Sequence, residues 1–189
     1  MNKITEAIRF AAKAHDKQLR KLDNHPYIFH ITEVGQIVSY MSDDVDTIVA
    51  AILHDTVEDT GVSVDEIEKK FGPRVKELVC AETEDKKRDK PAASTWKERK
   101  LESLEVLRNS DDIEEKKIWL ADKLSNIRSM YIYHIDNGKA TFEQFHEKNP
   151  KNHKWYYKEI AKILKKDFSK EPIYKEYCRL VDELFKEYK

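Results

Sequence analysis

The chain has 189 residues, of which 38% are charged, and its acidic and basic side chains almost cancel to a net charge of −1. This balance argues against a protein that holds nucleic acid by bulk electrostatic attraction. No window approaches the roughly 18 apolar residues of a membrane span, and the two cysteines, Cys80 and Cys178, form no CxxC motif. We therefore expect a cytoplasmic protein with no disulfide framework and no membrane or nucleic-acid partner.

The composition predicts an all-α fold, because the chain contains only four glycines and five prolines and is rich in helix-forming residues. Apolar periodicity predicts helices over residues 3–16, 27–41 and 48–60, with Ser42–Asp44 as the cap of the third. A capping box at residues 63–66 predicts a short fourth helix, and a fifth is predicted over residues 73–82.

The second half of the chain is predicted to continue as helices after a charged segment. Residues 84–91, EDKKRDKP, predict a mobile loop, and a capping signature at Ser94 predicts a sixth helix that reaches Leu107. Further helices are predicted over residues 113–133, 155–164 and 173–188. We expect about nine helices in one compact bundle, a single domain over residues 1–189 on which the helices of residues 150–189 pack.

The segment over residues 48–60 places four ionisable side chains at the end of an apolar helix. Its apolar run, residues 48–53, leads directly into His54, Asp55, Glu58 and Asp59. Residues four apart share a helix face, so these side chains are expected to form one patch. Burying such groups unpaired is strongly unfavourable, which favours a metal ion or a tight hydrogen-bond network there. A solvated acidic face is the simpler alternative.

Two more ionisable residues interrupt apolar helices. A lone histidine such as His30 is commonly an ordinary core residue, and Asp122 could form a core ion pair with Lys123 or Arg128. Together with the patch, however, they complete a mixed nitrogen and oxygen ligand set that consists of His30, His54, Asp55 and Asp122. Such a set suits Mn²⁺, Fe²⁺ or Zn²⁺ and leaves coordination positions for water and substrate.

This H…HD…D pattern resembles the HD-domain metal-dependent phosphohydrolases. Three stretches narrow the resemblance to the RelA/SpoT-type alarmone hydrolase domain, and all lie within residues 4–133. Residues 18–30, QLRKLDNHPYIFH, are similar to its Q-x-R-K-x-G-x-P-Y-x-x-H opening. Residues 54–60, HDTVEDT, are similar to its HD-x-x-EDT segment, and residues 120–129, LADKLSNIRS, resemble its LADRLHNMRT segment.

The resemblance implies an HD-type helical bundle that uses Mn²⁺ to remove the 3′-pyrophosphate from the nucleotides ppGpp and pppGpp. It implies that Glu58 and Asp59 are catalytic, and that the four-residue set above binds the metal. The substrate-binding positions that it implies are Arg20, Lys21, Tyr27, Lys123, Asn126 and Ser129. A chain of this length leaves no room for the family's synthetase or regulatory regions. We therefore expect a stand-alone small alarmone hydrolase. The sequence is compatible with a homo-oligomer.

The chain departs from the family pattern at several positions. Asp23 or Asn24 stands where the family has glycine, and Lys123 and Ser125 replace the usual arginine and histidine, so contacts around the base are expected to differ. Two alternatives stay open, an HD-type phosphohydrolase for another nucleotide, such as a nucleoside monophosphate or NADPH, and a non-catalytic nucleotide sensor. The intact ligand set and acidic pair argue against the sensor, which needs neither.

Overall fold

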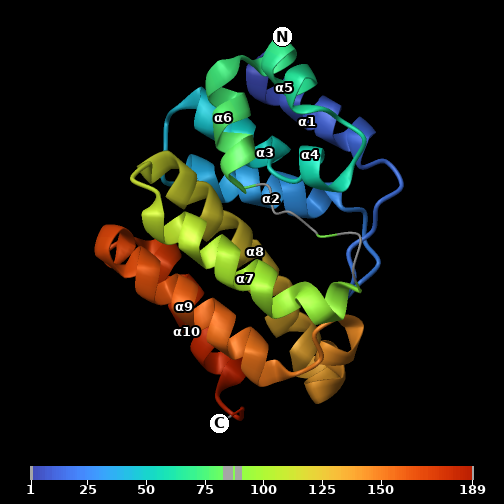
Figure 1. Cartoon of the computed structure of the whole chain (residues 1–189), viewed down its shortest axis with the longest axis vertical. Helices are drawn as coiled ribbons and strands as arrows, with labels where there is room; N and C mark the ends of the chain where they lie inside the picture. The colour runs from blue at the N-terminus through green and yellow to red at the C-terminus, as the bar shows by residue number, and fades with distance from the viewer. Residues whose placement is uncertain (1, 83–86, 88–90, 189) are drawn as a thin grey trace. The chain divides into compact units, whose positions relative to one another are not determined.

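The structure, a computed structural model, describes residues 2–82, 87 and 91–188 (Figure 1). Within these ranges no β-strand is formed, so the all-α prediction is confirmed. The helices are α1 (Lys3–Ala14), α2 (Ile28–Ser39), α3 (Val45–Leu53), α4 (Thr56–Asp59), α5 (Val64–Phe71), α6 (Pro73–Glu82), α7 (Ala92–Asn109), α8 (Ile113–Asn137), the 3-10 helix η1 (Gly138–Gln144), α9 (Pro150–Phe168) and α10 (Pro172–Phe185). None of the helices in the described ranges has the length and apolar character needed to span a bilayer.

The chain divides into two compact units that share α8. The first unit contains α1 to α6 and the part of α8 up to Asp122, and its core includes Val34, Val49 and Leu53. The second contains α7, α8 from Lys123 onwards, η1, α9 and α10, and its core is rich in buried aromatic residues such as Tyr177. The single domain expected over residues 1–189 stays a prediction.

Glycine allows the helices α2 and α3 of the first unit to approach closely. A Cβ added at Gly35 would lie 2.5 Å from Cγ1 of Ile52, well inside van der Waals contact. Ile52 is fully packed in the core, at 2% exposure. This close approach matters for the site, because α2 carries His30 and α3 leads into His54.

The single helix predicted over residues 48–60 is wrong, because α3 ends at Leu53 and α4 begins at Thr56. The imidazole Nδ1 of His54 lies 2.8 Å from the carbonyl oxygen of Ala51, so a side chain competes for a backbone acceptor at the break. Asp55 has φ −90° and ψ −4°, values of the sparsely populated bridge region that active-site residues often occupy. The Asp59 N–H still donates to the Asp55 carbonyl at 2.9 Å, so these two residues remain one turn apart.

The capping predictions were correct for α3 and α5 but wrong for α7. The Asp44 carboxylate accepts from the Thr47 N–H at 3.0 Å. The Ser63 hydroxyl accepts from the Glu66 N–H at 3.2 Å. Helix α7 begins two residues before the predicted cap at Ser94, whose hydroxyl donates to the Pro91 carbonyl at 2.8 Å instead.

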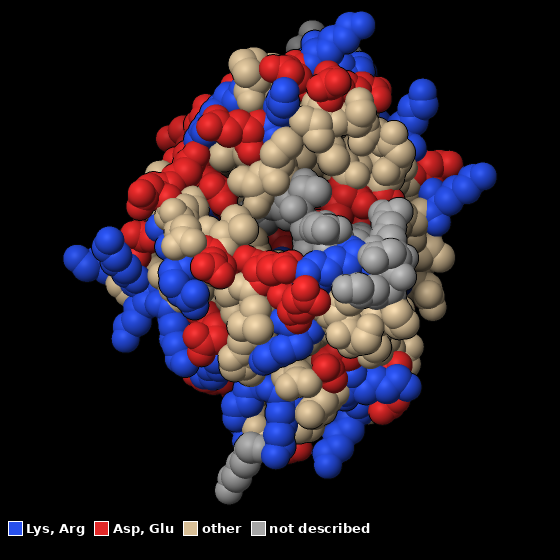
Figure 2. Space-filling model, viewed as in Figure 1, with Lys and Arg blue, Asp and Glu red and all other residues tan. Residues whose placement is uncertain are grey.

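Helices α8 and α9 are longer than periodicity indicated, whereas α10 ends at Phe185, three residues before its predicted end. Helix α9 begins at a proline in its first turn, five residues before the predicted start, and is capped by the Asn149 side chain. The 3-10 helix η1 was not predicted. Of the loop predicted over residues 84–91, all but Lys87 and Pro91 lie outside the described residues. Figure 2 shows Lys and Arg side chains interspersed with Asp and Glu side chains on one face, in keeping with the near-zero net charge.

Candidate metal centre

The four predicted metal ligands converge in the first unit. Nε2 of His30 lies 3.2 Å from Oδ1 of Asp122 and 3.6 Å from Oδ2 of Asp55. Nε2 of His54 lies 3.1 Å from the same oxygen of Asp55 and 3.7 Å from that of Asp122. Candidate ligand atoms of His30, His54 and Asp122 all lie within 4.8 Å of one another. Three separate helical segments therefore present two imidazoles and two carboxylates to one small volume.

Three members of this cluster are buried and the fourth is partly exposed. His30 and His54 are each 2% exposed and Asp122 is 5% exposed, whereas the Asp55 side chain is 20% exposed. Nε and Nη2 of Arg128 donate to Glu176 at 2.8 Å, whereas Asp122 faces the two imidazoles of the cluster. Asp55 is therefore the most solvent-exposed member of the cluster.

The electrostatics of the cluster favour charge on its members. Burial alone would raise the pKa of Asp55, but the charge of His54 and hydrogen bonds from His30 and His54 hold it well below its usual range. Burial would likewise lower the pKa of His54, but the Asp55 and Asp122 carboxylates raise it well above its usual value. The site thus stabilises negative charge on Asp55 and attracts positive charge.

Neighbouring groups fix the orientation of the candidate ligands. Because the Ala51 carbonyl can only accept, His54 carries a proton on Nδ1 and turns Nε2 towards the carboxylates. The Tyr27 hydroxyl donates to Oδ2 of Asp55 at 2.6 Å. Burial and the negative charge of Asp55 raise the pKa of Tyr27, which keeps that hydroxyl protonated and donating. A buried imidazole nitrogen aimed at two carboxylates is the donor chemistry of a divalent metal site, so these residues fit such an ion.

The predicted catalytic pair follows the candidate ligands on the one-turn helix α4. Glu58 and Asp59 are both half-buried, and Oδ2 of Asp59 accepts from the side-chain amide of Gln18 at 2.8 Å. The amide oxygen of Gln18 in turn lies 2.7 Å from Nδ1 of the buried His15. Sequence reasoning missed the roles of Gln18 and His15, although Gln18 stands at the start of the first motif stretch.

Arg20 lies in a loop that its own backbone hydrogen bonds close. The Arg20 N–H donates to the His25 carbonyl at 2.8 Å, and the Tyr27 N–H donates to the Gln18 carbonyl at 2.9 Å. Asn24 has φ +57°, in the left-handed region that favours glycine and tolerates asparagine. Asn24 therefore has the backbone conformation that glycine favours, and Asp23 is not among the described residues with positive φ.

The remaining predicted substrate-binding residues belong to the second unit. They are Lys21, in the turn after Arg20, and Lys123, Asn126 and Ser129, which lie half-buried on α8. Their grouping with the residues of the first unit stays a prediction.

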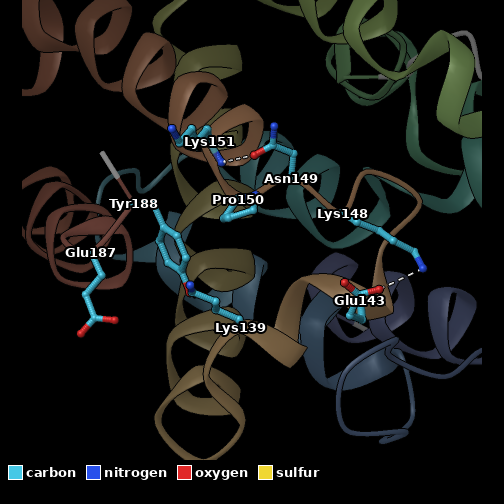
Figure 3. Close-up of a pocket in the computed structure, with 8 residues that line it drawn as sticks. All are labelled: Lys139, Glu143, Lys148, Asn149, Pro150, Lys151, Glu187 and Tyr188. Atoms are coloured by element: carbon cyan, nitrogen blue, oxygen red, sulfur yellow. Dashed lines mark hydrogen bonds and ion pairs between the residues drawn. The ribbon is translucent and has the colours of Figure 1, made fainter.

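A pocket of about 540 Å³ also opens in the second unit, around the N-terminus of α9 (Figure 3). Its lining comprises Lys139, Glu143, Lys148, Asn149, Pro150, Lys151, Glu187 and Tyr188. Lys148 pairs with Glu143 at 2.9 Å, and Glu187 offsets a second lysine, so the charges of the pocket nearly cancel. The lining includes none of the predicted site residues, and we assign the pocket no role.

Comparison with known proteins identifies relatives over most of the chain. Residues 7–144 match the family model of the HD domain. The guanosine-3′,5′-bis(diphosphate) 3′-pyrophosphohydrolase of Aquifex aeolicus is 33% identical over 136 residues, which are 72% of this chain and only 19% of that protein. The human guanosine-3′,5′-bis(diphosphate) 3′-pyrophosphohydrolase MESH1 is 40% identical over 130 residues, 67% of this chain and 69% of its own length.

The fold is shared with solved structures as well. A metazoan ortholog of SpoT, described as hydrolysing ppGpp and playing a role in starvation responses, superposes with a TM-score of 0.74 and 29% identity. The match covers 98% of this chain and 95% of that one, which confirms the expected HD-type fold. The chain therefore belongs to the HD-domain family, together with the MESH1 pyrophosphohydrolases.

Proposed function

We propose that the protein is a metal-dependent hydrolase that removes the 3′-pyrophosphate from ppGpp and pppGpp and releases pyrophosphate. The observation that carries the proposal is the buried cluster of two imidazoles and two carboxylates directly followed by the Glu58–Asp59 pair. Relatives that share 33% to 40% identity with this chain and carry the name of this activity support it. We propose the cytoplasm as its location and a small nucleotide as its substrate.

We propose Mn²⁺ as the ion, held by the four residues His30, His54, Asp55 and Asp122. Two imidazole nitrogens and two carboxylate oxygens are compatible with Mn²⁺, and they leave coordination positions open. When bound, such an ion lowers the pKa of a coordinated water and offsets the charge of the phosphates. The bond from Tyr27 to Asp55 holds one carboxylate in a single orientation, and the Ala51 carbonyl does the same for His54.

Glu58 acts with Asp59 on the attacking water. Both carboxylates lie one helical turn beyond the ligands, where they can orient the water and accept its proton. The water oxygen bonds to the phosphorus next to the ribose 3′ oxygen, the bond between that phosphorus and the 3′ oxygen breaks, and the 3′ oxygen regains a proton. Pyrophosphate leaves, and the nucleotide keeps its 5′ phosphates.

We assign the rest of the nucleotide to the predicted basic and polar substrate-binding residues. Arg20 and Lys21 neutralise phosphate charge, and the planar guanidinium of Arg20 can hold two phosphate oxygens at once. Lys123, Asn126 and Ser129 contact the base and ribose. The Tyr27 hydroxyl donates to Asp55, so we assign it to positioning rather than to direct contact with the substrate.

The test is release of pyrophosphate from ppGpp by protein that is first stripped of metal with a chelator and then reloaded with Mn²⁺. We expect activity only after reloading. Glu58→Gln and Asp59→Asn should each lower kcat by roughly 10²- to 10⁴-fold, the usual contribution of a general base, while the bound Mn²⁺ stays stoichiometric. Release of orthophosphate from nucleoside monophosphates or NADPH, with none of pyrophosphate from ppGpp, would contradict the proposed substrate. Nucleotide binding without any hydrolysis would instead identify a sensor.

A further inference from the structure

Gln18 connects the end of α1 to the catalytic helix α4 through two side-chain contacts. Its amide Nε2 donates to Oδ2 of Asp59 at 2.8 Å, across 41 positions of sequence. Its amide oxygen lies 2.7 Å from Nδ1 of His15, the residue that caps α1. The side chain of Gln18 therefore bridges a buried imidazole and one of the two proposed catalytic carboxylates.

The chemistry of the three groups fixes the direction of both contacts. The amide NH₂ of Gln18 must face the Asp59 carboxylate, because an ionised carboxylate only accepts. The amide oxygen then faces His15, whose Nδ1 must carry the proton. His15 is 3% exposed, and within the described part of the chain no group forms a hydrogen bond with its Nε2, so its hydrogen bond is made through Nδ1. A reversed amide would place its oxygen against the carboxylate.

The backbone holds Gln18 firmly enough to serve as an anchor. The Gln18 N–H donates to the His15 carbonyl at 2.9 Å, and the Gln18 carbonyl accepts from the Tyr27 N–H at 2.9 Å. An antiparallel bridge between the next residue, Leu19, and Pro26 continues this pairing. Helix α4, by contrast, has four residues, too short for its own hydrogen bonds to determine its geometry.

We propose that Gln18 is a positioning residue that holds the Asp59 carboxylate in its catalytic orientation, with His15 fixing the direction of the Gln18 amide. The inference rests on the proposed function, because it takes Asp59 to act on the attacking water. A neutral amide can orient a carboxylate without adding charge beside the metal ligands. A misplaced catalytic group loses rate rather than substrate affinity, so the effect belongs to kcat.

The test compares Gln18→Met with Gln36→Met in Mn²⁺-loaded protein. Methionine keeps the length of glutamine but cannot donate to Asp59. Gln36 is an exposed residue of α2 whose amide donates to the Tyr40 hydroxyl at 3.0 Å, so the same substitution there removes one side-chain bond far from Asp59 in sequence, whereas Gln18→Met removes two. We expect Gln18→Met to lower kcat for ppGpp about 10- to 100-fold, as for a hydrogen bond to a charged group, with KM within about twofold. Gln36→Met should leave both constants unchanged.

A second readout does not depend on activity. Amide hydrogen exchange at Asp59 and Thr60, which form the backbone bonds of α4, should become about 10-fold faster in Gln18→Met and stay unchanged in Gln36→Met. Gln18→Glu supplies a second variant of the same shape. It keeps the acceptor for His15 but places a carboxylate against Asp59, and its kcat should fall at least as far.

The outcomes separate this inference from the proposed function. If wild-type protein releases no pyrophosphate from ppGpp, the proposed function fails, and exchange at α4 still decides whether Gln18 holds the helix. Unchanged hydrogen exchange at Asp59 and Thr60 in Gln18→Met would show that Gln18 does not hold α4 in place. Three results in the Gln18 variants would contradict the proposal that Gln18 positions the Asp59 carboxylate. They are a kcat equal to that of the wild type, a rise in KM alone, and loss of the bound Mn²⁺.

Discussion

Replacing Gly35 with alanine should push apart the two helices that carry His30 and His54. The new Cβ would lie 2.5 Å from Cγ1 of Ile52, roughly 1 Å closer than an ordinary van der Waals contact allows. Ile52 cannot easily yield, because a β-branched side chain in a helix has one strongly preferred rotamer and this one is packed in the core. The strain must therefore be relieved by movement of α2 relative to α3.

The two consequences of this movement differ in size. Overpacking destabilises by about 1–3 kcal/mol, and the better helix propensity of alanine returns roughly 1 kcal/mol. The free energy of unfolding should thus fall by at most about 2 kcal/mol. A metal site tolerates errors of only about 0.2 Å in ligand distance, so even part of a ~1 Å shift between the histidine helices is large for the site. We expect the affinity for Mn²⁺ to fall about 10- to 100-fold, the usual effect of disturbed ligand orientation.

Calorimetric titration with Mn²⁺ and urea unfolding of the metal-free protein measure the two effects separately. Gly61→Ala is the matched control, because a Cβ at Gly61 would meet nothing within 4 Å. In the double variant Gly35→Ala with Ile52→Ala, the methyl group at position 35 occupies the space left by the Ile52 side chain. The loss in the free energy of unfolding should therefore be smaller than the sum of the two single losses by at least about 1 kcal/mol. Wild-type Mn²⁺ affinity in Gly35→Ala, together with strict additivity, would refute the reasoning.

Three further substitutions test other parts of the structure. Tyr27→Phe removes the donor to Asp55, and titration should show Mn²⁺ binding about 10-fold weaker; equal affinity would leave that bond without a role. Asn24→Ala should lower the free energy of unfolding in urea by about 1–2 kcal/mol, whereas Asn24→Gly should not. Burial lowers the pKa of His153 below 6.5, so protonation favours the unfolded chain and stability is lost as the pH falls below about 6.5. His153→Gln, which can still donate to the Glu147 carbonyl, should flatten that slope in unfolding measured from pH 7.5 to 5.5; an unchanged slope would contradict it.

The elements that sequence periodicity predicted well are those whose burial follows the helical repeat. Helices α2, α6 and α8 begin within a residue of their predicted starts, and Asp44 caps α3 as expected. Periodicity could not find the break after Leu53, because the residues on both sides are compatible with a helix and the break involves the bond between His54 and the Ala51 carbonyl. Ser94 was a plausible cap, but the helix begins at Ala92 and the hydroxyl lies inside its first turn.

At the site too, local sequence patterns predicted some features, and contacts between distant residues determine the others. Motif spacing brought together His30, His54, Asp55 and Asp122, because each stands at a fixed place in a stretch of recognisable sequence. The contact from Gln18 to Asp59 joins residues 41 apart that no local pattern connects. The sequence also left Asp23 and Asn24 as equal candidates for the glycine position, and the positive φ of Asn24 favours Asn24.

Tyr27 links two parts of the molecule that would bind different ligands. Its N–H donates to the Gln18 carbonyl in the loop that carries Arg20, and its hydroxyl donates to Asp55. A phosphate bound by Arg20 would therefore affect the backbone of Tyr27, and a cation bound by Asp55 would affect the hydroxyl of the same residue. Linkage is reciprocal, so the factor by which the cation changes nucleotide affinity is also the factor by which the nucleotide changes cation affinity. A nucleotide dissociation constant measured at one metal concentration then contains this coupling free energy as well as the intrinsic affinity.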